Sequence, residues 1–157
     1  STLHTNDAAG SVMRLLDMGV QDYLLTSAVI GIQAQRLVRT LCSECREAYE
    51  PIEEVVIRWG LERFSNGKPV TLHRHVGCDA CGGTGYTGRL AIVEILLMTD
   101  SIRDLVLRRS DAGEIARLAG EQGMVTMRDD GLAKAVAGLT PIEEVLRVTP
   151  AAPENGD

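Results

Sequence analysis

The residues best suited to chemistry in this sequence are its four cysteines, which form two C-x-x-C pairs separated by 32 residues. A C-x-x-C turn places two thiolates on one side of a tight bend, where they can share a tetrahedral metal ion. Two such turns complete a set of four sulfur ligands with no open position, which is typical of a structural zinc site and not of a catalytic one. We therefore predict one structural Zn²⁺ ion per chain, bound by Cys42, Cys45, Cys78 and Cys81.

The spacing leaves other uses of these residues open. Two disulfides would need an oxidising compartment, and nothing in the sequence marks the chain as secreted. A redox C-x-x-C pair usually stands alone at the start of a helix, so two matched pairs argue against redox chemistry. His73 and His75 lie near Cys78 and are alternative ligands. Because four cysteines already saturate the ion, we expect both histidines to be solvated loop residues.

The cysteines lie in a segment, residues 42–88, where glycine, proline and histidine become frequent and the hydrophobic periodicity fades. A helix after Pro51, over residues 52–59, is the one regular element that the pattern predicts there. We expect a small subdomain organised by the metal rather than by a core, since structural zinc contributes on the order of 10 kcal/mol to folding in small modules.

Ordinary secondary structure is predicted on both sides of this segment. Residues 1–5 look like part of a strand, and Asn6 or Asp7 can cap a helix that ends near Gly19. A short helix and then a strand follow over residues 23–41.

The second half of the chain continues with a strand over residues 89–98 and is helical beyond it. Helix starts are predicted at Thr99 or Asp100, at Asp111 and at Thr140-Pro141. Arg128, Asp129 and Asp130 before Gly131 predict a further cap with local ion pairs, and residues 150–157 are predicted to be disordered.

The composition limits the classes of function. Hydrophobic residues make up 45% of the 157, so a core can form. The net charge of −6 argues against a nucleic-acid partner, because phosphate binding normally requires a basic face. The sequence contains no run of about 18 apolar residues, which is the length that would be needed to span a membrane.

Several stretches, taken in order, resemble the type II secretion and type IV pilus assembly ATPase family, closest to its GspE type. The similarity extends from residue 1 to about residue 149. Retraction motors of that family usually lack a tetracysteine insert, which favours a secretion or pilus-extension motor. The matching stretches are 1–7, which resembles the family's His box, 35–42, 77–81, 84–89 with Glu94, 127–131 and 143–149.

The resemblance implies a homo-hexameric, RecA-like motor ATPase at the cytoplasmic face of the inner membrane. Such a motor binds ATP and Mg²⁺ and associates peripherally with inner-membrane platform proteins to assemble pilin-like subunits. By the same resemblance, His4 is expected near the γ-phosphate of the nucleotide. Arg36 and Arg39 also follow the family's pattern, and they could stabilise phosphate charge, bind across a subunit interface or simply be solvated.

A phosphate-binding loop is missing from the sequence. Neither Lys68 nor Lys134 follows the required glycine pattern, so Walker A and Walker B are expected upstream of Ser1. With no initiator Met, the chain is expected to be an excised fragment, and we predict that alone it does not hydrolyse ATP.

The predicted fold class is α/β, the C-terminal part of a RecA-like ATPase domain with an inserted four-cysteine zinc subdomain and a C-terminal helical bundle. We place the end of the RecA-like core at 1–41, the zinc subdomain at 42–88, a strand plus helical subdomain at 89–149 and a tail at 150–157.

A second functional hypothesis is a stand-alone zinc-binding interaction module. Cys78 to Gly85 matches the C-x-x-C-x-G-x-G unit found in the cysteine-rich region of J-domain co-chaperones. The first pair departs from that unit, because Cys45 is followed by Arg46, Glu47 and Ala48 without glycines. The resemblance to co-chaperones is therefore local.

Overall fold

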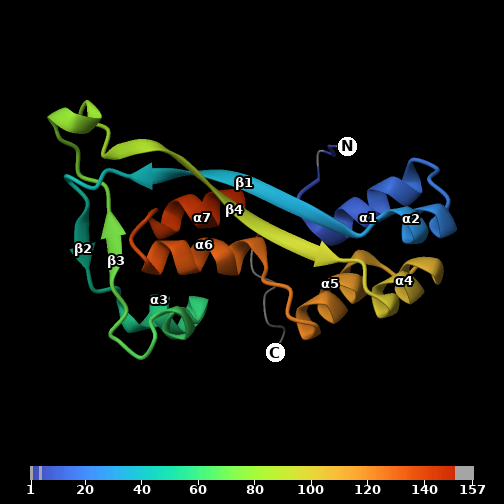
Figure 1. Ribbon diagram of the computed structural model, residues 1–157. Helices are drawn as coiled ribbons and strands as arrows, with labels where there is room; N and C mark the ends of the chain where they lie inside the picture. The colour runs from blue at the N-terminus through green and yellow to red at the C-terminus, as the bar shows by residue number, and fades with distance from the viewer. Residues whose placement is uncertain (1, 4, 151–157) are drawn as a thin grey trace. The chain divides into compact units, whose positions relative to one another are not determined.

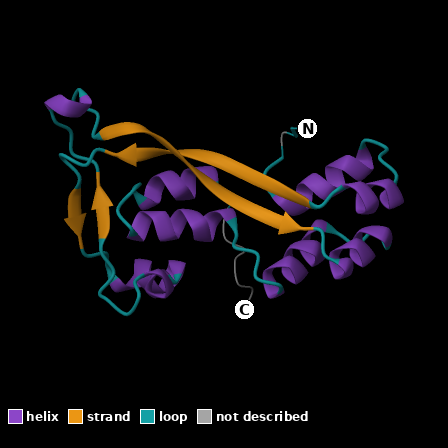
Figure 2. Ribbon diagram, viewed as in Figure 1, coloured by secondary structure: helices purple, strands orange, loops and turns teal. Residues whose placement is uncertain are grey.

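The computed structural model describes residues 2, 3 and 5–150 of the chain. The predicted role of His4 and the predicted disorder of residues 151–157 lie outside these described residues. The described part has a mixed α/β composition, with helices and two small two-stranded sheets (Figures 1 and 2).

The chain divides into two compact units, each built from two separate stretches. Unit 1 comprises residues 1–35 and 93–127, and unit 2 comprises residues 36–92 and 128–157. The long strands β1 (Gly31–Leu41) and β4 (Tyr86–Leu97) pair with each other, run in opposite directions and contribute residues to both units.

Unit 1 is mainly helical. It contains α1 (Ala8–Asp17), α2 (Asp22–Ala28), α4 (Asp100–Leu107) and α5 (Ala112–Glu121). Helix α5 contacts both α1 and α4, and α4 also contacts α2. Apolar side chains spaced three or four residues apart give each longer helix one apolar face. The buried side chains of this unit include Val12, Leu25, Leu96, Ile102, Val106 and Ile115.

The helix starts of unit 1 follow the local chemistry of their caps. The side chains of Asp7, Thr99 and Asp111 each accept the backbone N–H three residues further on, at 2.6, 3.4 and 2.9 Å. Gly19, just beyond α1, has a φ of +89°. The predicted helix starts at Asp7, Thr99 and Asp111 and the predicted end of the first helix near Gly19 are confirmed. The strand expected over residues 1–5 is wrong, because Thr2, Leu3 and Thr5 belong to no strand.

Unit 2 contains more apolar packing within residues 42–88 than the sequence pattern predicts. Strands β2 (Glu47–Tyr49) and β3 (Leu72–Arg74) form an antiparallel pair. They are joined through α3 (Glu53–Trp59) and the short 3₁₀ helix η1 (Leu61–Phe64). Leu61 and Leu72 are fully buried, so this segment contributes to a core and does not depend on a metal alone. The core of the unit includes Val38, Leu61, Leu72, Ile92, Leu132 and Val145.

Helix α6 (Met127–Val136) corrects one prediction. Arg128 to Asp130 form its first turn rather than a cap before it, and Gly131 lies inside the helix. A Cβ atom on Gly131 would lie 2.4 Å from Cγ1 of Val145 in α7 (Ile142–Val148). The glycine therefore permits a close helix approach and does not end a helix. Asp130 forms an ion pair with Lys134, one helical turn further on, at 2.5 Å.

Two other element boundaries also differ from prediction. Thr140 does not cap α7, because its hydroxyl donates to the carbonyl of Arg39 at 2.8 Å. Strand β4 begins at Tyr86, before the predicted start at Arg89. Within the described residues, no helix has the length and apolar character needed to cross a membrane.

Candidate metal centre

The four cysteines meet at one end of unit 2. Cys42 follows the last residue of β1, and Cys45 lies in the turn before β2. Cys78 precedes the single 3₁₀ turn η2 (Asp79–Cys81), which ends at the fourth cysteine. All four Sγ atoms lie within 4.8 Å of one another. The fold thus brings the four predicted ligands into one cluster.

The separations of the sulfurs fit a tetrahedral metal site. Sγ of Cys42 lies 3.9 Å from that of Cys78, and Sγ of Cys81 lies 3.9 Å from Cys45 and 3.8 Å from Cys78. A tetrahedral zinc ion with Zn–S bonds of about 2.3 Å requires sulfurs about 3.8 Å apart. A disulfide requires about 2.05 Å, and all four cysteines are free. The donor set and its geometry therefore fit a divalent ion that prefers sulfur.

Two glycines aim backbone N–H groups at this cluster. Gly77 donates to Sγ of Cys45 at 3.3 Å, and Gly85 donates to Sγ of Cys81 at 3.1 Å. Their φ angles are +116° and +75°, and a Cβ atom would lie 2.5 Å from the Gly83 carbonyl oxygen or 2.7 Å from Cβ of His75, respectively. Only glycine fits both positions without strain, and the N–H donors offset part of the charge of the thiolates.

Backbone N–H donors also make one thiol acidic. The backbone N–H of Cys78, assisted by that of Gly85, lowers the pKa of Cys81 to about 6. Burial raises the pKa of Cys45 to about 11. The lowered pKa favours the thiolate form of Cys81, which is the form that binds metal ions. A bound cation would favour the ionised form of the remaining thiols.

The two nearby histidines are not part of the cluster, which among the described residues contains cysteines only. His75 is exposed, with Nδ1 3.0 Å from the hydroxyl of Tyr86, as expected for a solvated residue. The expectation is wrong for His73, which lies on β3 and is partly buried. Burial lowers the pKa of His73, and its Nδ1 finds no hydrogen-bond partner among the described residues.

A buried carboxylate that the sequence did not single out lies in the same unit. Glu144 on α7 is only 3% exposed and accepts hydrogen bonds from Arg39 and Arg147. The Arg39 guanidinium, first among these donors, lowers the pKa of Glu144 to about 2. Arg39 also stacks 4.0 Å above the ring of Tyr86. Of the two arginines considered for phosphate binding, Arg39 is therefore held by protein groups, while Arg36 is half-buried on β1.

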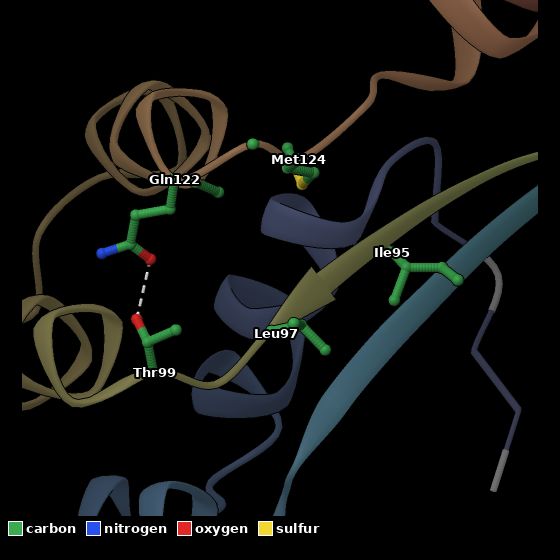
Figure 3. A pocket seen from close by; sticks show the side chains of 7 residues that line it. Ile95, Leu97, Thr99, Gln122 and Met124 are labelled. Atoms are coloured by element: carbon green, nitrogen blue, oxygen red, sulfur yellow. Dashed lines mark hydrogen bonds between the residues drawn. The ribbon is translucent and has the colours of Figure 1, made fainter.

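The pocket in unit 1 offers little chemistry. It has a volume of about 100 Å³ and lies beside the end of β4 and the loop after α5 (Figure 3). The hydroxyl of Thr99 donates to Oε1 of Gln122 at 2.8 Å, so these two side chains bind each other. No titratable side chain lines it, so the cysteine cluster is the stronger candidate site. The lining residues are Ile95, Leu97, Thr99, Ala119, Gln122, Gly123 and Met124.

Comparison with known proteins identifies the family. The model of the family described as "Type II/IV secretion system protein" matches residues 1–147. The chain belongs to this family. It is similar to the type II secretion system protein E of Xanthomonas campestris, with 53% identity over 149 residues, which are 95% of this chain and 26% of that protein. It is also similar to the type IV pilus assembly ATPase PilB of Thermus thermophilus, with 44% identity over 149 residues, 95% of this chain and 17% of that protein.

A third relative of this type II/IV secretion family is the type II secretion system ATPase E of Vibrio cholerae. It is 45% identical over 150 residues, which are 95% of this chain and 29% of that protein. The chain thus spans 29% or less of the length of these three relatives. The resemblance inferred from the motifs is confirmed at the level of the family.

Proposed function

We propose that this chain is the C-terminal part of the cytoplasmic motor ATPase that powers type II protein secretion. The observation that carries the proposal is the 53% identity to a type II secretion system protein E, which extends over 149 residues and includes both sides of the cysteine segment. In this role the full-length protein hydrolyses ATP with Mg²⁺ and drives pseudopilus assembly. It acts as a homo-hexamer, peripheral to the inner membrane, with platform proteins as its partners.

Within that motor, each part of the chain has a distinct task. Residues 1–41 belong to a RecA-like core, with His4 near the γ-phosphate, and residues 89–149 form a strand and helical subdomain. The loops that bind phosphate and Mg²⁺ belong to parts of the protein outside this sequence. Residues 42–88 form the zinc-binding subdomain.

The proposed zinc ion has a structural role. Four sulfur ligands leave no coordination position for water or substrate, so the site cannot act as a Lewis acid toward a substrate. The cluster instead connects the end of β1 to the turn before β4, which are distant in sequence. Native mass spectrometry of the purified chain should find one zinc ion per chain, and two disulfides without metal would contradict this role.

A type IV pilus extension ATPase is the second candidate, because the Thermus thermophilus PilB protein is 44% identical over 149 residues. The stand-alone zinc module has less support. The family match includes residues well outside the cysteine segment, on both sides of it.

A chimera tests the proposal. This chain replaces the matching segment of the Xanthomonas campestris protein E in a strain that lacks the gene, and secreted enzyme activity is measured in the medium. We expect secretion to be restored, and to be lost when Cys78→Ser is introduced. A matched chimera with Thermus thermophilus PilB is assayed for surface pili.

The outcomes separate the two candidates. Restored pili without restored secretion favours the pilus motor. If neither chimera works although both are expressed and contain zinc, the proposal that the chain is part of a motor of this kind is wrong.

A further inference from the structure

Arg46 closes the turn that carries the first pair of cysteines. The backbone N–H groups of Cys45 and Arg46 donate to the carbonyl of Cys42, at 3.4 and 3.0 Å. Arg46 is therefore part of the turn that aims two of the four sulfurs, although it is not a member of the cysteine cluster. A group that holds the side chain of Arg46 also limits how this turn can move.

The second pair of cysteines is held by its near neighbours in the sequence. Sγ of Cys81 accepts the backbone N–H groups of Cys78 and Gly85, at 3.2 and 3.1 Å. The hydroxyl of Thr84 donates to the carbonyl of Cys81 at 2.8 Å. The first pair differs, because the residues on both sides of it bind a segment that is distant in the sequence.

That segment is the turn between α6 and α7, which lies beside β3 (Figure 1). Just before the first pair, the N–H of Leu41 donates to the carbonyl of Leu139 at 2.9 Å. Just after the pair, the guanidinium of Arg46 donates to the carbonyl of Gly138. A hydrogen bond from a charged donor is stronger than one between neutral groups. Both ends of the first cysteine turn are thus attached to the α6–α7 turn.

The place where Arg46 binds is closely packed. Gly138 is buried, and its φ of +75° is one that favours glycine. A Cβ atom on Gly138 would lie 2.9 Å from Nδ1 of His73 on β3 and 3.2 Å from Nη1 of Arg46. His73 pairs with Ala48 on β2, two residues beyond Arg46. A side chain at position 138 would therefore displace the imidazole, the guanidinium or the carbonyl that Arg46 binds.

We propose that Arg46 is a positioning residue of the metal site, and that its bond to Gly138 couples metal binding to the turn before α7. An ion needs both sulfurs of the first turn at once, and a turn that is already anchored loses less conformational freedom when the ion binds. Such coupling is reciprocal, so a bound ion also orders the α6–α7 turn. The inference rests on the zinc site of the proposed function and adds to it a residue that is not a ligand.

The zinc affinity of the full-length protein tests the role of Arg46. It is measured in reducing buffer by competition with a chelator of known affinity. We expect Arg46→Ala to weaken zinc binding roughly 10-fold, at the lower end of the losses typical when a group that orients metal ligands is removed. Arg46→Lys keeps a charged donor and should stay within about threefold of the wild type.

The matched control for these variants is Arg74→Ala. Arg74 is an exposed arginine on β3 in the same subdomain, and it forms an ion pair with Glu47 rather than a contact with the α6–α7 turn. This control should leave the zinc affinity unchanged.

Gly138→Ala separates anchoring from the charge of Arg46. It leaves the guanidinium and all four cysteines present, but its Cβ atom disturbs the contact at the Gly138 carbonyl. We expect it to weaken zinc binding about as much as Arg46→Ala does. The double variant should lose less than about threefold beyond either single variant, because both remove the same contact. Gly120→Ala, where no atom lies within 4 Å, should bind zinc like the wild type.

Hydrogen exchange covers the case in which Gly138→Ala does not fold. Exchange of the amides of residues 137–140 is compared by mass spectrometry between the wild type and Arg46→Ala, both saturated with zinc. We expect these amides to exchange roughly 10-fold faster in Arg46→Ala, through loss of one charge-assisted hydrogen bond. The amides of α3, which does not contribute to this contact, should exchange at the wild-type rate.

The results distinguish the inference from the zinc site on which it rests. Wild-type zinc affinity in Arg46→Ala, or in a folded Gly138→Ala, would overturn the inference and leave the zinc site intact. Unchanged exchange at residues 137–140 in zinc-saturated Arg46→Ala would also overturn it. A wild-type protein that binds no zinc would overturn the proposed zinc site, and the inference with it.

Discussion

Replacing Glu144 by glutamine should destabilise the chain, because this buried side chain is bound by two arginines. Each oxygen of this buried carboxylate accepts two hydrogen bonds, at 2.8 to 3.1 Å, from Arg39 and Arg147. In Glu144→Gln an NH₂ group takes the place of one oxygen, whichever way the amide is turned. Two N–H donors then face a donor, so two of the four hydrogen bonds are lost.

The size of the effect follows from the pKa of the carboxyl. Its pKa falls from the ordinary 4.5 to about 2 in the folded protein. At about 1.4 kcal/mol per pKa unit, this difference corresponds to roughly 3 kcal/mol. The arginines are 52% and 60% exposed and can turn to water, so we discount the loss to about 2 kcal/mol. In a chain of this size that lowers the unfolding temperature by roughly 4–8 °C.

Urea unfolding of the zinc-loaded chain at pH 7 measures this loss. Glu143→Gln is the control, because Glu143 is exposed and adjacent, and its change should stay within about 0.5 kcal/mol. The folded-state pKa of Glu144 lies below its unfolded value. Its contribution is therefore complete above pH about 4.5 and disappears as the pH falls toward about 2.

The difference in unfolding free energy between wild type and Glu144→Gln, taken at the same pH, should shrink over that range. Loss of metal in acid affects both proteins and largely cancels in the difference. A Glu144→Gln variant as stable as the Glu143→Gln control at pH 7 would refute the reasoning.

Three further changes should have effects of different sizes. Cys78→Ser removes one of four sulfur ligands and should abolish stoichiometric zinc in native mass spectrometry, with loss of much of the roughly 10 kcal/mol that such a site contributes. Gly131→Ala places a Cβ atom 2.4 Å from Val145 and should cost about 1–3 kcal/mol in urea unfolding, whereas Gly120→Ala, where no atom lies within 4 Å, should cost nothing. Asp111→Ala removes the cap of α5 and should lower the free energy of unfolding by about 1 kcal/mol in thermal denaturation.

The features that sequence could predict are those that depend on near neighbours. Asp7, Thr99 and Asp111 cap helices through N–H groups only three residues away, so their identity and position suffice. The cysteine cluster could also be predicted, although Cys42 and Cys78 are 36 positions apart in the sequence. Each C-x-x-C pair supplies only two of the four ligands that a tetrahedral metal ion needs. The two pairs are therefore expected to bind the same ion, whatever the fold.

What sequence reasoning missed is the contacts of polar groups whose partners are far away along the chain. Glu144 is bound by a residue 105 positions away, and Glu94 by one 86 positions away. Thr140 was predicted to cap a helix because it precedes proline, but its hydroxyl donates to the carbonyl of Arg39, 101 positions away. A local pattern cannot distinguish such a residue from a solvated one, since the contacts exist only once the elements have packed.

The first cysteine pair is connected by hydrogen bonds to parts of unit 2 outside the cysteine segment. Leu41, the last residue of β1, donates its N–H to the carbonyl of Leu139, and Cys42 next to it donates to the carbonyl of Gly85. Arg46, just after the first cysteine pair, donates to the carbonyl of Gly138. The turn that leads into α7 is therefore bound on both sides of the first C-x-x-C pair. A tetrahedral ion bound by all four cysteines would fix that pair relative to the second and, through these contacts, the start of the C-terminal helix.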